Sequence, residues 1–283
     1  MALVVLRHAA REDYAAKRLG ENWQRSEYAA AHGGWNPRLT DEGLLQASAA
    51  GTSIARHLDR LGLPPVARIF SSPFTRCLQT SAAVATSLGL SEIAVERGLA
   101  EGLLEEWYRS WAVPGADSTW GGPPHAQMGV PLPVDAALHP KAHVPAGELL
   151  HGPAEAEEAL RRLGVTDVAV DAAHAPFAPA PTYVWGHFES EHALGDRIEH
   201  TLLALKALRP DQTIVACTHG GPCGHAYERL LRQGSAPVAQ YSAIYIYRPV
   251  PAAAAAEDAA ASAASWTCDV AADVSHLATL GSA

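Results

Sequence analysis

The sequence has no long apolar run and few basic residues. Among its 283 residues, no uninterrupted apolar stretch reaches the roughly 20 residues that a membrane-spanning helix needs. The N-terminal apolar run, Ala2 to Leu6, is shorter than the core of a signal peptide, which has about 7–15 residues. The formal net charge of -9 disfavours nucleic acid and anionic membranes as partners. These absences predict a soluble, cytoplasmic protein that binds neither.

Cysteine is also scarce. The four cysteines, Cys77, Cys217, Cys223 and Cys268, show neither the paired spacing of metal ligands nor a dense disulfide framework. Such usage is typical of a reducing compartment. Cys217 and Cys223 lie on either side of His219, and we interpret both as small buried apolar side chains, with their sensitivity to oxidation left open.

What the chain does contain is enough apolar material for a full core, since 48% of its residues are hydrophobic. Strand-like and helix-like patterns alternate along it, which predicts an α/β fold with a mostly parallel sheet and helices on both faces. We expect a single domain over residues 1–283. Strands are expected at residues 2–6, 93–95, 213–218, 243–247 and 266–270, and helices at 41–61, 73–88, 191–208 and 220–231.

Two of these helices have recognisable ends. Thr40 can cap the first one, whose first turn holds Asp41 and Glu42. The second is expected to hold Pro73 in its first turn and to stop at Gly89. Residues at helical spacing predict a core-facing stripe along the first helix: Leu44, Ala47, Gly51, Ile54, Leu58 and Leu61.

The middle of the chain differs in composition. Between Pro114 and Pro181 lie 11 of the 20 prolines, which disfavours long regular elements. We therefore predict an irregular insertion over residues 103–188 that forms a cap on the main domain. The alanine-rich stretch 252–264 is compatible with either a helix or a loop.

Two histidines follow strand-like runs: His8 after Ala2–Arg7, and His219 after Thr213–Thr218. Ligands bind at the carboxyl ends of the strands in an open α/β sheet, so the two imidazoles are expected to meet in one pocket. With 14 histidines in the chain, either one alone is compatible with a surface or core role. The pair indicates phosphoryl chemistry, because a neutral imidazole can attack phosphorus and carry the group as phosphohistidine.

Phosphoryl transfer also needs positive charge around the three equatorial oxygens of the transferred group. Arginine suits this role, since its planar fork donates two hydrogen bonds to a phosphate and stays protonated. The chain offers Arg7, Arg11 and Arg76. Arg76 lies near the start of a predicted helix, where the helix dipole also attracts an anion. Arg11 begins a charged triplet that is equally ordinary at a protein surface.

Four segments in a fixed order resemble a known family. They are Leu6-Arg7-His8-Ala9; Ser71-Ser72-Pro73 followed by Arg76 and Gln79-Thr80; Gly98-Leu99-Ala100-Glu101; and Thr218-His219-Gly220-Gly221. Together they are similar to the histidine phosphatase (phosphoglycerate mutase-like) superfamily over most of the chain. Within that superfamily, the chain resembles the branch that holds the domains of suppressor of T-cell receptor signalling and ecdysteroid-phosphate phosphatase. The matching residues are Arg11, Val170-Asp171 with Pro176, and Glu189-Ser190 with Arg197.

The resemblance implies a role for each matching residue. His8 would be the nucleophile, His219 would donate to the phosphoryl group in the transition state, and Glu101 would protonate the leaving oxygen. The residues implied to bind phosphate are Arg7, Arg11, Arg76 and His219. Glu105 and Glu106 compete with Glu101 for the role of the acid.

The chain departs from the family at two places. Ala9 stands where a glycine often follows the nucleophile. The serine and asparagine of the mutases are absent beyond it, because Arg11 and Glu12 occupy that stretch. We therefore expect a metal-independent phosphomonoesterase that needs no cofactor and acts on a small-molecule or phosphoprotein phosphoester, with a homodimer left open.

The cap insertion supplies candidates for the substrate pocket: Trp107, Trp111, Trp120, Trp185 and His125. Tryptophans in such a segment also anchor it to the core, and that alternative stays open. Because the insertion is poor in lysine and arginine, we expect aryl or other hydrophobic phosphoesters to be preferred.

Three alternatives remain. A sugar-phosphate phosphatase or phosphomutase would hold a second phosphate, for which Arg109 and Lys141 are the main candidates. A noncatalytic phosphate-binding scaffold would not need both histidines and an acid. A metallohydrolase would be built on His219 and His225, although their spacing matches no helix face.

Overall fold

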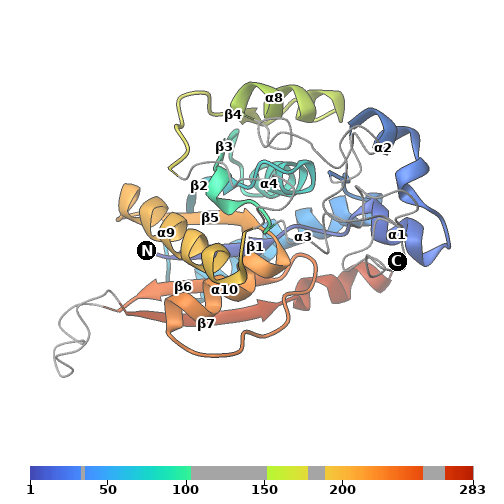
Figure 1. Cartoon of the computed structure of the whole chain (residues 1–283). Coiled ribbons are helices and arrows are strands. Elements are labelled where there is room, and N and C mark those ends of the chain that lie inside the picture. The colour runs from blue at the N-terminus through green and yellow to red at the C-terminus, as the bar shows by residue number, and fades with distance from the viewer. Residues whose placement is uncertain (33–35, 103–151, 178–188, 251–264, 283) are drawn as a thin grey trace.

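The computed structural model describes residues 1–32, 36–102, 152–177, 189–250 and 265–282 (Figure 1). They form a seven-stranded, mostly parallel sheet with helices on both faces, which confirms the predicted fold class. No helix in these ranges is both long and apolar enough to cross a bilayer. Several residues singled out from the sequence lie outside the described ranges: Glu105, Glu106, Trp107, Arg109, Trp111, Trp120, His125, Lys141, Trp185 and the stretch 252–264.

The order across the sheet is β4-β3-β2-β5-β1-β6-β7. From β4 to β1 every pair of neighbours is parallel, whereas β6 pairs antiparallel with both β1 and β7. The strands are β1 (Leu3–Arg7), β2 (Val66–Ser71), β3 (Glu92–Val95), β4 (Ala169–Val170), β5 (Thr213–Thr218), β6 (Ile244–Pro249) and β7 (Trp266–Asp273).

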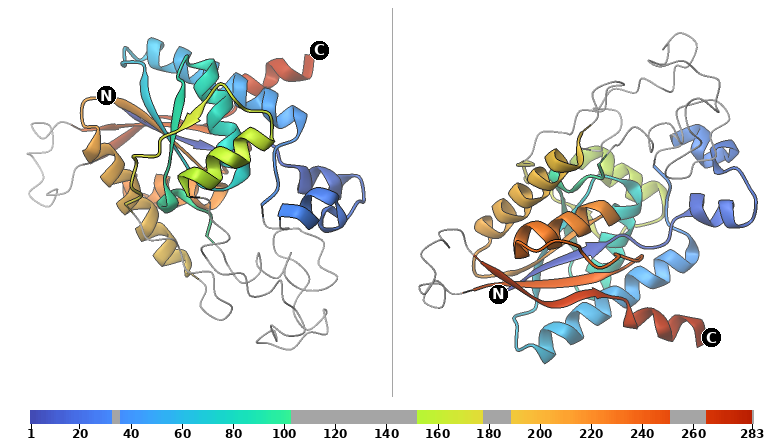
Figure 2. Two further views of the ribbon diagram at one scale, coloured as in Figure 1. Left: turned by 90° about the horizontal axis from the view of Figure 1, so that it is seen from above. Right: turned by 60° about the horizontal axis from the view of Figure 1, so that its bottom comes forward.

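The helices cover the sheet in two layers. They are α1 (Glu12–Arg18), α2 (Glu27–His32), α3 (Asp41–Arg60), α4 (Thr75–Ser87), α8 (Pro153–Arg162), α9 (Glu191–Leu208) and α10 (Gly220–Leu231), with 3-10 turns η1 (Trp23–Arg25), η2 (Arg97–Leu99) and η4 (Ser275–Ser282). Side chains of β1 alternate between two cores: Val4 and Leu6 pack with α3, α4 and α8, and Leu3 and Val5 pack with α9 and α10. Figure 2 shows α9 and α10 lying side by side on one face of the sheet.

The predicted helices and strands are confirmed within a few residues at each end. Thr40 caps α3 by accepting a hydrogen bond from the Gly43 N–H over 2.9 Å. Gly89, just past α4, has φ +71°, the left-handed conformation expected at a helix stop. The helix predicted at 191–208 and the strand predicted at 213–218 have the predicted bounds.

Two details of the predicted helices are wrong. Leu44 is 37% exposed, because Gly43 rather than Leu44 occupies the buried side of the first turn of α3. Pro73 lies outside α4, which begins at Thr75 with Phe74 as its extended N-cap residue.

The irregular structure predicted for residues 103–188 does not hold for 152–177. Pro153 occupies the first position of the regular helix α8, where a missing N–H costs nothing. A proline count cannot distinguish such a residue from one that interrupts a helix. Leu160 of α8 and Val170 of β4 join the core beside α4, so this part of the chain extends the main layers.

Candidate active site

Three neighbouring strands deliver polar side chains to one edge of the sheet. Arg7 at the end of β1 is in register with Thr218 at the end of β5, and Ser71 at the end of β2 is in register with Cys217. His8, His219 and Ser72 each come directly after one of these strands. The two imidazoles meet as predicted, with ring centroids 5.2 Å apart and the rings at 68° to each other.

His8 is almost fully buried, and its hydrogen bonds define its tautomer. Nδ1 lies 2.9 Å from the carbonyl oxygen of Ala9. A carbonyl oxygen only accepts, so Nδ1 carries the proton and the lone pair is on Nε2. Burial, followed by the charges of Arg76 and Arg7, lowers the pKa of His8 well below its usual value. The ring is therefore neutral at neutral pH and nucleophilic at Nε2.

The backbone that follows His8 is held by side chains from two helices. Thr80 Oγ1 on α4 accepts from the Ala9 N–H over 3.1 Å, and Gln46 Oε1 on α3 accepts from the Ala10 N–H over 3.0 Å. The sequence does not identify Gln46 as a residue that supports the site, because nothing distinguishes it from the other polar residues of the helix. These bonds fix the carbonyl group that orients the His8 ring.

Arg76, the second residue of α4, is fully buried between the two histidines. Its Nε donates to His8 Nε2 over 3.3 Å, and its Nη2 donates to His219 Nδ1 over 3.1 Å. The ring of Phe74 lies 4.5 Å from the guanidinium carbon. Burial and the charge of Arg11 lower the pKa of Arg76 to about 10, so the side chain remains a cation at neutral pH.

His219 is fully buried at the N-terminal end of α10. Because Nδ1 accepts from Arg76, Nε2 carries the proton and donates to Ser72 Oγ over 2.8 Å. Burial, then the charge of Arg76, lowers the pKa of His219 well below its usual value. Cys217 and Cys223 on either side of it are buried, as predicted, and burial raises the pKa of the Cys223 thiol.

Arg7 is fixed by its surroundings on several sides. Its guanidinium lies 4.4 Å from the centre of the Tyr241 ring, and Nη1 donates to the carbonyl of Ala239. On Gly220, a Cβ atom would lie only 3.4 Å from the guanidinium carbon. The Nε–H of Arg7 is buried and has no hydrogen-bond partner among the residues that the structure describes. This N–H can serve an anion without breaking an existing bond.

Arg11 is 7% exposed, so the surface alternative for this charged triplet is wrong. It forms a bidentate ion pair with Asp13, in which Nε and Oδ1 are 2.6 Å apart, and its guanidinium carbon lies 4.7 Å from the centre of the Tyr14 ring. Burial alone would lower the pKa of Arg11, but Asp13 more than offsets it and the pKa is raised. The sequence did not identify Asp13 or Tyr14 as parts of the site.

Glu101 follows η2 and its C-cap residue, Ala100. Its Oε2 is 3.8 Å from His219 Nδ1, and its Oε1 accepts from the Gly102 N–H over 3.2 Å. Burial raises the pKa of Glu101, against the charges of Arg76 and Arg7 that lower it. A carboxyl group of this kind retains its proton to higher pH than an exposed one and can act as an acid.

Four of the side chains described above, those of Arg7, His8, Arg11 and Glu101, line a cavity of about 260 Å3. Its lining residues are Arg7, His8, Arg11, Tyr14, Glu101, Gly102, Glu191, Leu194, Gly220 and Gly221. The structure thus brings together the predicted histidines, arginines and acid from the ends of β1, β2, β3 and β5. The lining thus combines two arginines with an aromatic and an apolar side chain.

The two histidines of the metallohydrolase hypothesis contact different partners. His225 Nε2 lies 2.8 Å from Glu191 Oε2, while His219 contacts Ser72 and Arg76. Within the described ranges, no group of three or more histidine, cysteine, aspartate or glutamate side chains is arranged to hold a metal ion.

The sequence profile of the histidine phosphatase superfamily (branch 1) matches residues 3–113. This segment contains His8, Glu101 and the three arginines of the site, whereas His219 lies beyond it. No curated protein matches the chain significantly in sequence.

Solved structures of phosphatases share the fold. Ecdysone phosphate phosphatase from Bombix mori, in complex with tungstate, is 15% identical with a TM-score of 0.54, covering 87% of this chain and 88% of its own. Mycobacterial glucosyl-3-phosphoglycerate phosphatase, in complex with VO3, is 19% identical with a TM-score of 0.51, covering 95% and 97%. A phosphoserine phosphatase mutant from Entamoeba histolytica, in complex with phosphoserine, is 16% identical with a TM-score of 0.51, covering 98% of each chain. The chain is therefore similar in sequence to the histidine phosphatase superfamily over residues 3–113, and it shares its fold with these solved phosphatases.

Proposed function

We propose that the chain hydrolyses phosphoric monoesters through a phosphohistidine formed on His8. The observation that supports this most strongly is the tautomer of His8. The Ala9 carbonyl accepts a hydrogen bond from the Nδ1–H group, so the lone pair is on Nε2, the atom that contacts Arg76 and belongs to a residue lining the cavity. A neutral nucleophile next to fixed positive charge suits attack on an anionic phosphoryl group.

In the first step, Nε2 of His8 attacks phosphorus and the bond between phosphorus and the ester oxygen breaks. The N–H groups of Arg76 that now contact the two imidazoles would turn to the phosphoryl oxygens, together with Arg7 and Arg11. Nδ1 keeps its proton, which remains hydrogen-bonded to the Ala9 carbonyl. The phosphorylated ring therefore carries the positive charge that forms. The three guanidinium groups stabilise the charge of the transferring group.

Glu101 supplies the proton that the leaving alkoxide needs. Burial raises its pKa, so the carboxyl keeps its proton to higher pH than an exposed glutamate does. In the second step, Glu101, now ionised, takes a proton from water. The oxygen of that water attacks phosphorus, the bond between phosphorus and Nε2 breaks, and inorganic phosphate leaves.

His219 would donate to a phosphoryl oxygen in the transition state, and this requires a change of tautomer. In the structure its Nδ1 accepts from Arg76 and its Nε2 donates to Ser72. Once Arg76 turns to the phosphate, Nε2 can release its proton to water and Nδ1 can take one up from water, after which the Ser72 hydroxyl donates to Nε2. Ser72 would therefore set the protonation of His219 during catalysis.

For the substrate, we propose an aryl or other hydrophobic phosphoester. In the described cavity, Tyr14 and Leu194 offer aromatic and apolar surface beside the arginines. Arg7 and Arg11 line the cavity and Arg76 contacts His8, so in this proposal all three serve one phosphoryl group and a second phosphate would need other cations. Burial of an apolar leaving group contributes about 25 cal/mol per Å2 to binding.

A panel of phosphoesters tests this proposal. Phenyl phosphate, a phosphotyrosine peptide and a steroid phosphate should give higher kcat/KM than fructose bisphosphate or a nucleotide. Preference for fructose bisphosphate would favour the sugar-phosphate alternative, and tight phosphate binding without turnover would favour a scaffold. Activity should survive EDTA, whereas its loss and recovery with added metal would contradict the histidine mechanism.

A further inference from the structure

The segment that leads to Glu101 has three consecutive buried carbonyl groups, and side chains satisfy all of them. Thr218 Oγ1 donates to the Leu99 carbonyl over 2.6 Å. Nη1 of Arg197 donates to the carbonyls of Gly98, over 2.7 Å, and Ala100, over 3.1 Å. These residues form the end of η2, where helical hydrogen bonds cease and carbonyl groups need other partners.

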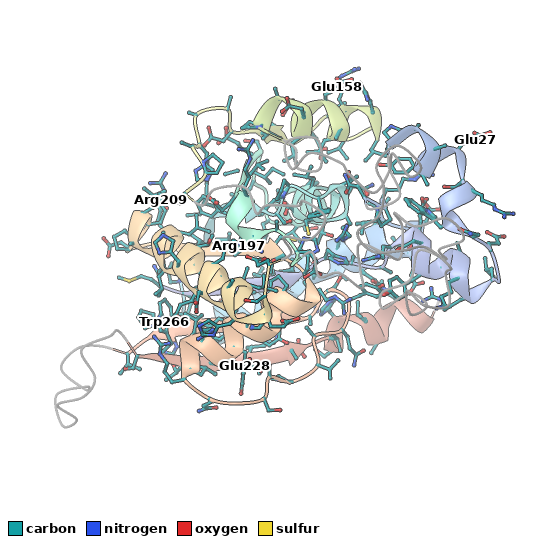
Figure 3. The ribbon with its side chains drawn as sticks, viewed as in Figure 1. Glu27, Glu158, Arg197, Arg209, Glu228 and Trp266 are labelled. Carbon is teal, nitrogen blue, oxygen red and sulfur yellow. The ribbon has the colours of Figure 1, made fainter. Side chains whose placement is uncertain are left out.

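The guanidinium of Arg197 is itself held in one orientation. Nε and Nη2 donate to the two carboxylate oxygens of Glu189, over 2.8 and 2.6 Å. The side chain of Arg197 is 10% exposed and that of Glu189 is 12% exposed, so solvent screens this pair little. Figure 3 labels Arg197 on α9, where the helix lies against the body of the molecule. The bidentate pair between the guanidinium of Arg197 and the carboxylate of Glu189 thus fixes the Nη1 atom that donates to the carbonyls of Gly98 and Ala100.

The Ala100 carbonyl belongs to the peptide group that joins Ala100 to Glu101. A hydrogen bond to this oxygen holds the peptide plane and therefore the direction in which the Glu101 side chain leaves the backbone. Leu194, one turn before Arg197 on α9, packs against Gly102, the residue that follows Glu101: a Cβ on Gly102 would lie 2.5 Å from the Cδ2 atom of Leu194. The first turns of α9 therefore hold the backbone on both sides of the acid.

We infer that Arg197, oriented by Glu189, is a positioning residue that holds Glu101 where it can protonate the leaving oxygen. The inference rests on the proposed function, in which Glu101 is the acid. Lysine cannot replace Arg197 fully, because a single ammonium group cannot bridge a carboxylate and two carbonyls in one plane. A glutamine at position 189 keeps the shape of its partner but removes the charge.

The test compares two substrates that differ in their leaving groups. The phenolate released from phenyl phosphate needs a proton, whereas the nitrophenolate released from p-nitrophenyl phosphate does not. The variants are Arg197→Ala, Arg197→Lys and Glu189→Gln, with Glu101→Gln as the reference for loss of the acid. Arg232→Ala is the matched control, since Arg232 also forms an ion pair with α9, through Glu199, but is 62% exposed. Thermal unfolding of each variant reports the fold separately.

Glu101→Gln should lower kcat/KM for phenyl phosphate by about 100-fold or more, and far less for p-nitrophenyl phosphate. Arg197→Ala should show the same selective loss, of about 10-fold or more, with smaller selective losses in Arg197→Lys and Glu189→Gln and none in Arg232→Ala. Adding Arg197→Ala to Glu101→Gln should cause no further selective loss, because both act through one group. The alkaline limb of the pH profile should also move to lower pH in Arg197→Ala, as a less tightly held Glu101 becomes more exposed to water.

Equal losses for the two substrates in Arg197→Ala, with the reference variant still selective, would overturn the positioning role and leave the proposed function intact. An additive selective loss in the double variant would overturn it as well. If Arg197→Ala does not fold, unchanged selectivity in both Arg197→Lys and Glu189→Gln would overturn it. Equal losses in Glu101→Gln itself would instead show that the acid of the proposed function is elsewhere, and the inference would fall with it.

Discussion

Nε of Arg76 donates a hydrogen bond to Nε2 of His8 over 3.3 Å, so the cation most deeply buried in the site contacts the proposed nucleophilic atom directly. The same guanidinium reaches His219 through Nη2. One side chain therefore orders both imidazoles before a substrate arrives. In the proposed mechanism these two N–H groups turn from the ring nitrogens to the oxygens of an incoming phosphate.

This relationship predicts a large effect of Arg76→Ala. Because both binding and transition-state stabilisation are lost, kcat/KM should fall by about 100- to 1,000-fold or more for every phosphoester, irrespective of leaving group. Arg76→Lys should recover little, since an ammonium group lacks the fork that contacts both histidines. Arg161→Ala, which removes a 66% exposed arginine on α8, should match the wild type. A loss of less than 10-fold in Arg76→Ala would contradict this role.

The pKa shifts predict a bell-shaped pH profile with an acid optimum. His8 must be neutral to attack, and its pKa is lowered, so activity should persist well below pH 6.5 before protonation of His8 abolishes it. Glu101 must be protonated, and its pKa is raised, so activity should fall as the pH rises through a value above 4.5. The alkaline limb for phenyl phosphate should be lost in Glu101→Gln. An optimum above pH 8 would contradict these assignments.

Tyr241 is predicted to act on phosphate affinity through Arg7. Contact between a guanidinium and an aromatic ring contributes about 0.5–2 kcal/mol, so Tyr241→Leu should weaken inhibition by inorganic phosphate by roughly 2- to 30-fold. Tyr241→Phe keeps the ring over Arg7 and should bind phosphate nearly as well as the wild type. Equal weakening in both variants would show that the hydroxyl group, and not the ring, matters.

Gly43 is predicted to be essential for the close packing of α3 against the backbone that follows His8. A Cβ at this position would lie 2.2 Å from the carbonyl oxygen of Ala10, and the neighbouring atoms are backbone. Gly43→Ala should therefore lower the free energy of unfolding by about 1–3 kcal/mol and reduce kcat. At Gly234, where a Cβ would meet no atom within 4 Å, alanine should change neither quantity. Denaturant unfolding of the two variants makes this comparison, and equal stability would contradict it.

Much of the sheet and its catalytic edge could be predicted from the sequence. Buried parallel strands such as Thr213–Thr218 are continuous apolar runs, and a histidine that follows such a run must lie at the ligand-binding edge. The helix 191–208 was equally clear, since Ser190 caps it and Pro210 follows it closely. In each case, local pattern and tertiary position agree.

Other parts of the site could not be predicted, because they depend on contacts between distant segments. Tyr241 follows a loop whose sequence carries no signal, and hydrogen bonds between distant backbone segments hold it at the site, among them the one from the Ser242 N–H to the carbonyl of His8 over 3.2 Å. Asp13 belongs to a charged triplet that is ordinary at a protein surface, but in the structure it is buried and accepts a hydrogen bond from Arg11. The role of Arg197 likewise arises from two backbone carbonyls that no sequence pattern identifies.

The most direct test of the mechanism is to trap the covalent intermediate. Wild-type protein mixed with a 32P-labelled phosphoester and quenched within milliseconds should carry label that is stable to alkali and labile to acid, as expected for a phosphorus–nitrogen bond. The labelled peptide should contain His8, and His8→Ala should trap no label and show no turnover. Undiminished turnover in His8→Ala, or label located on another residue, would contradict the proposed mechanism.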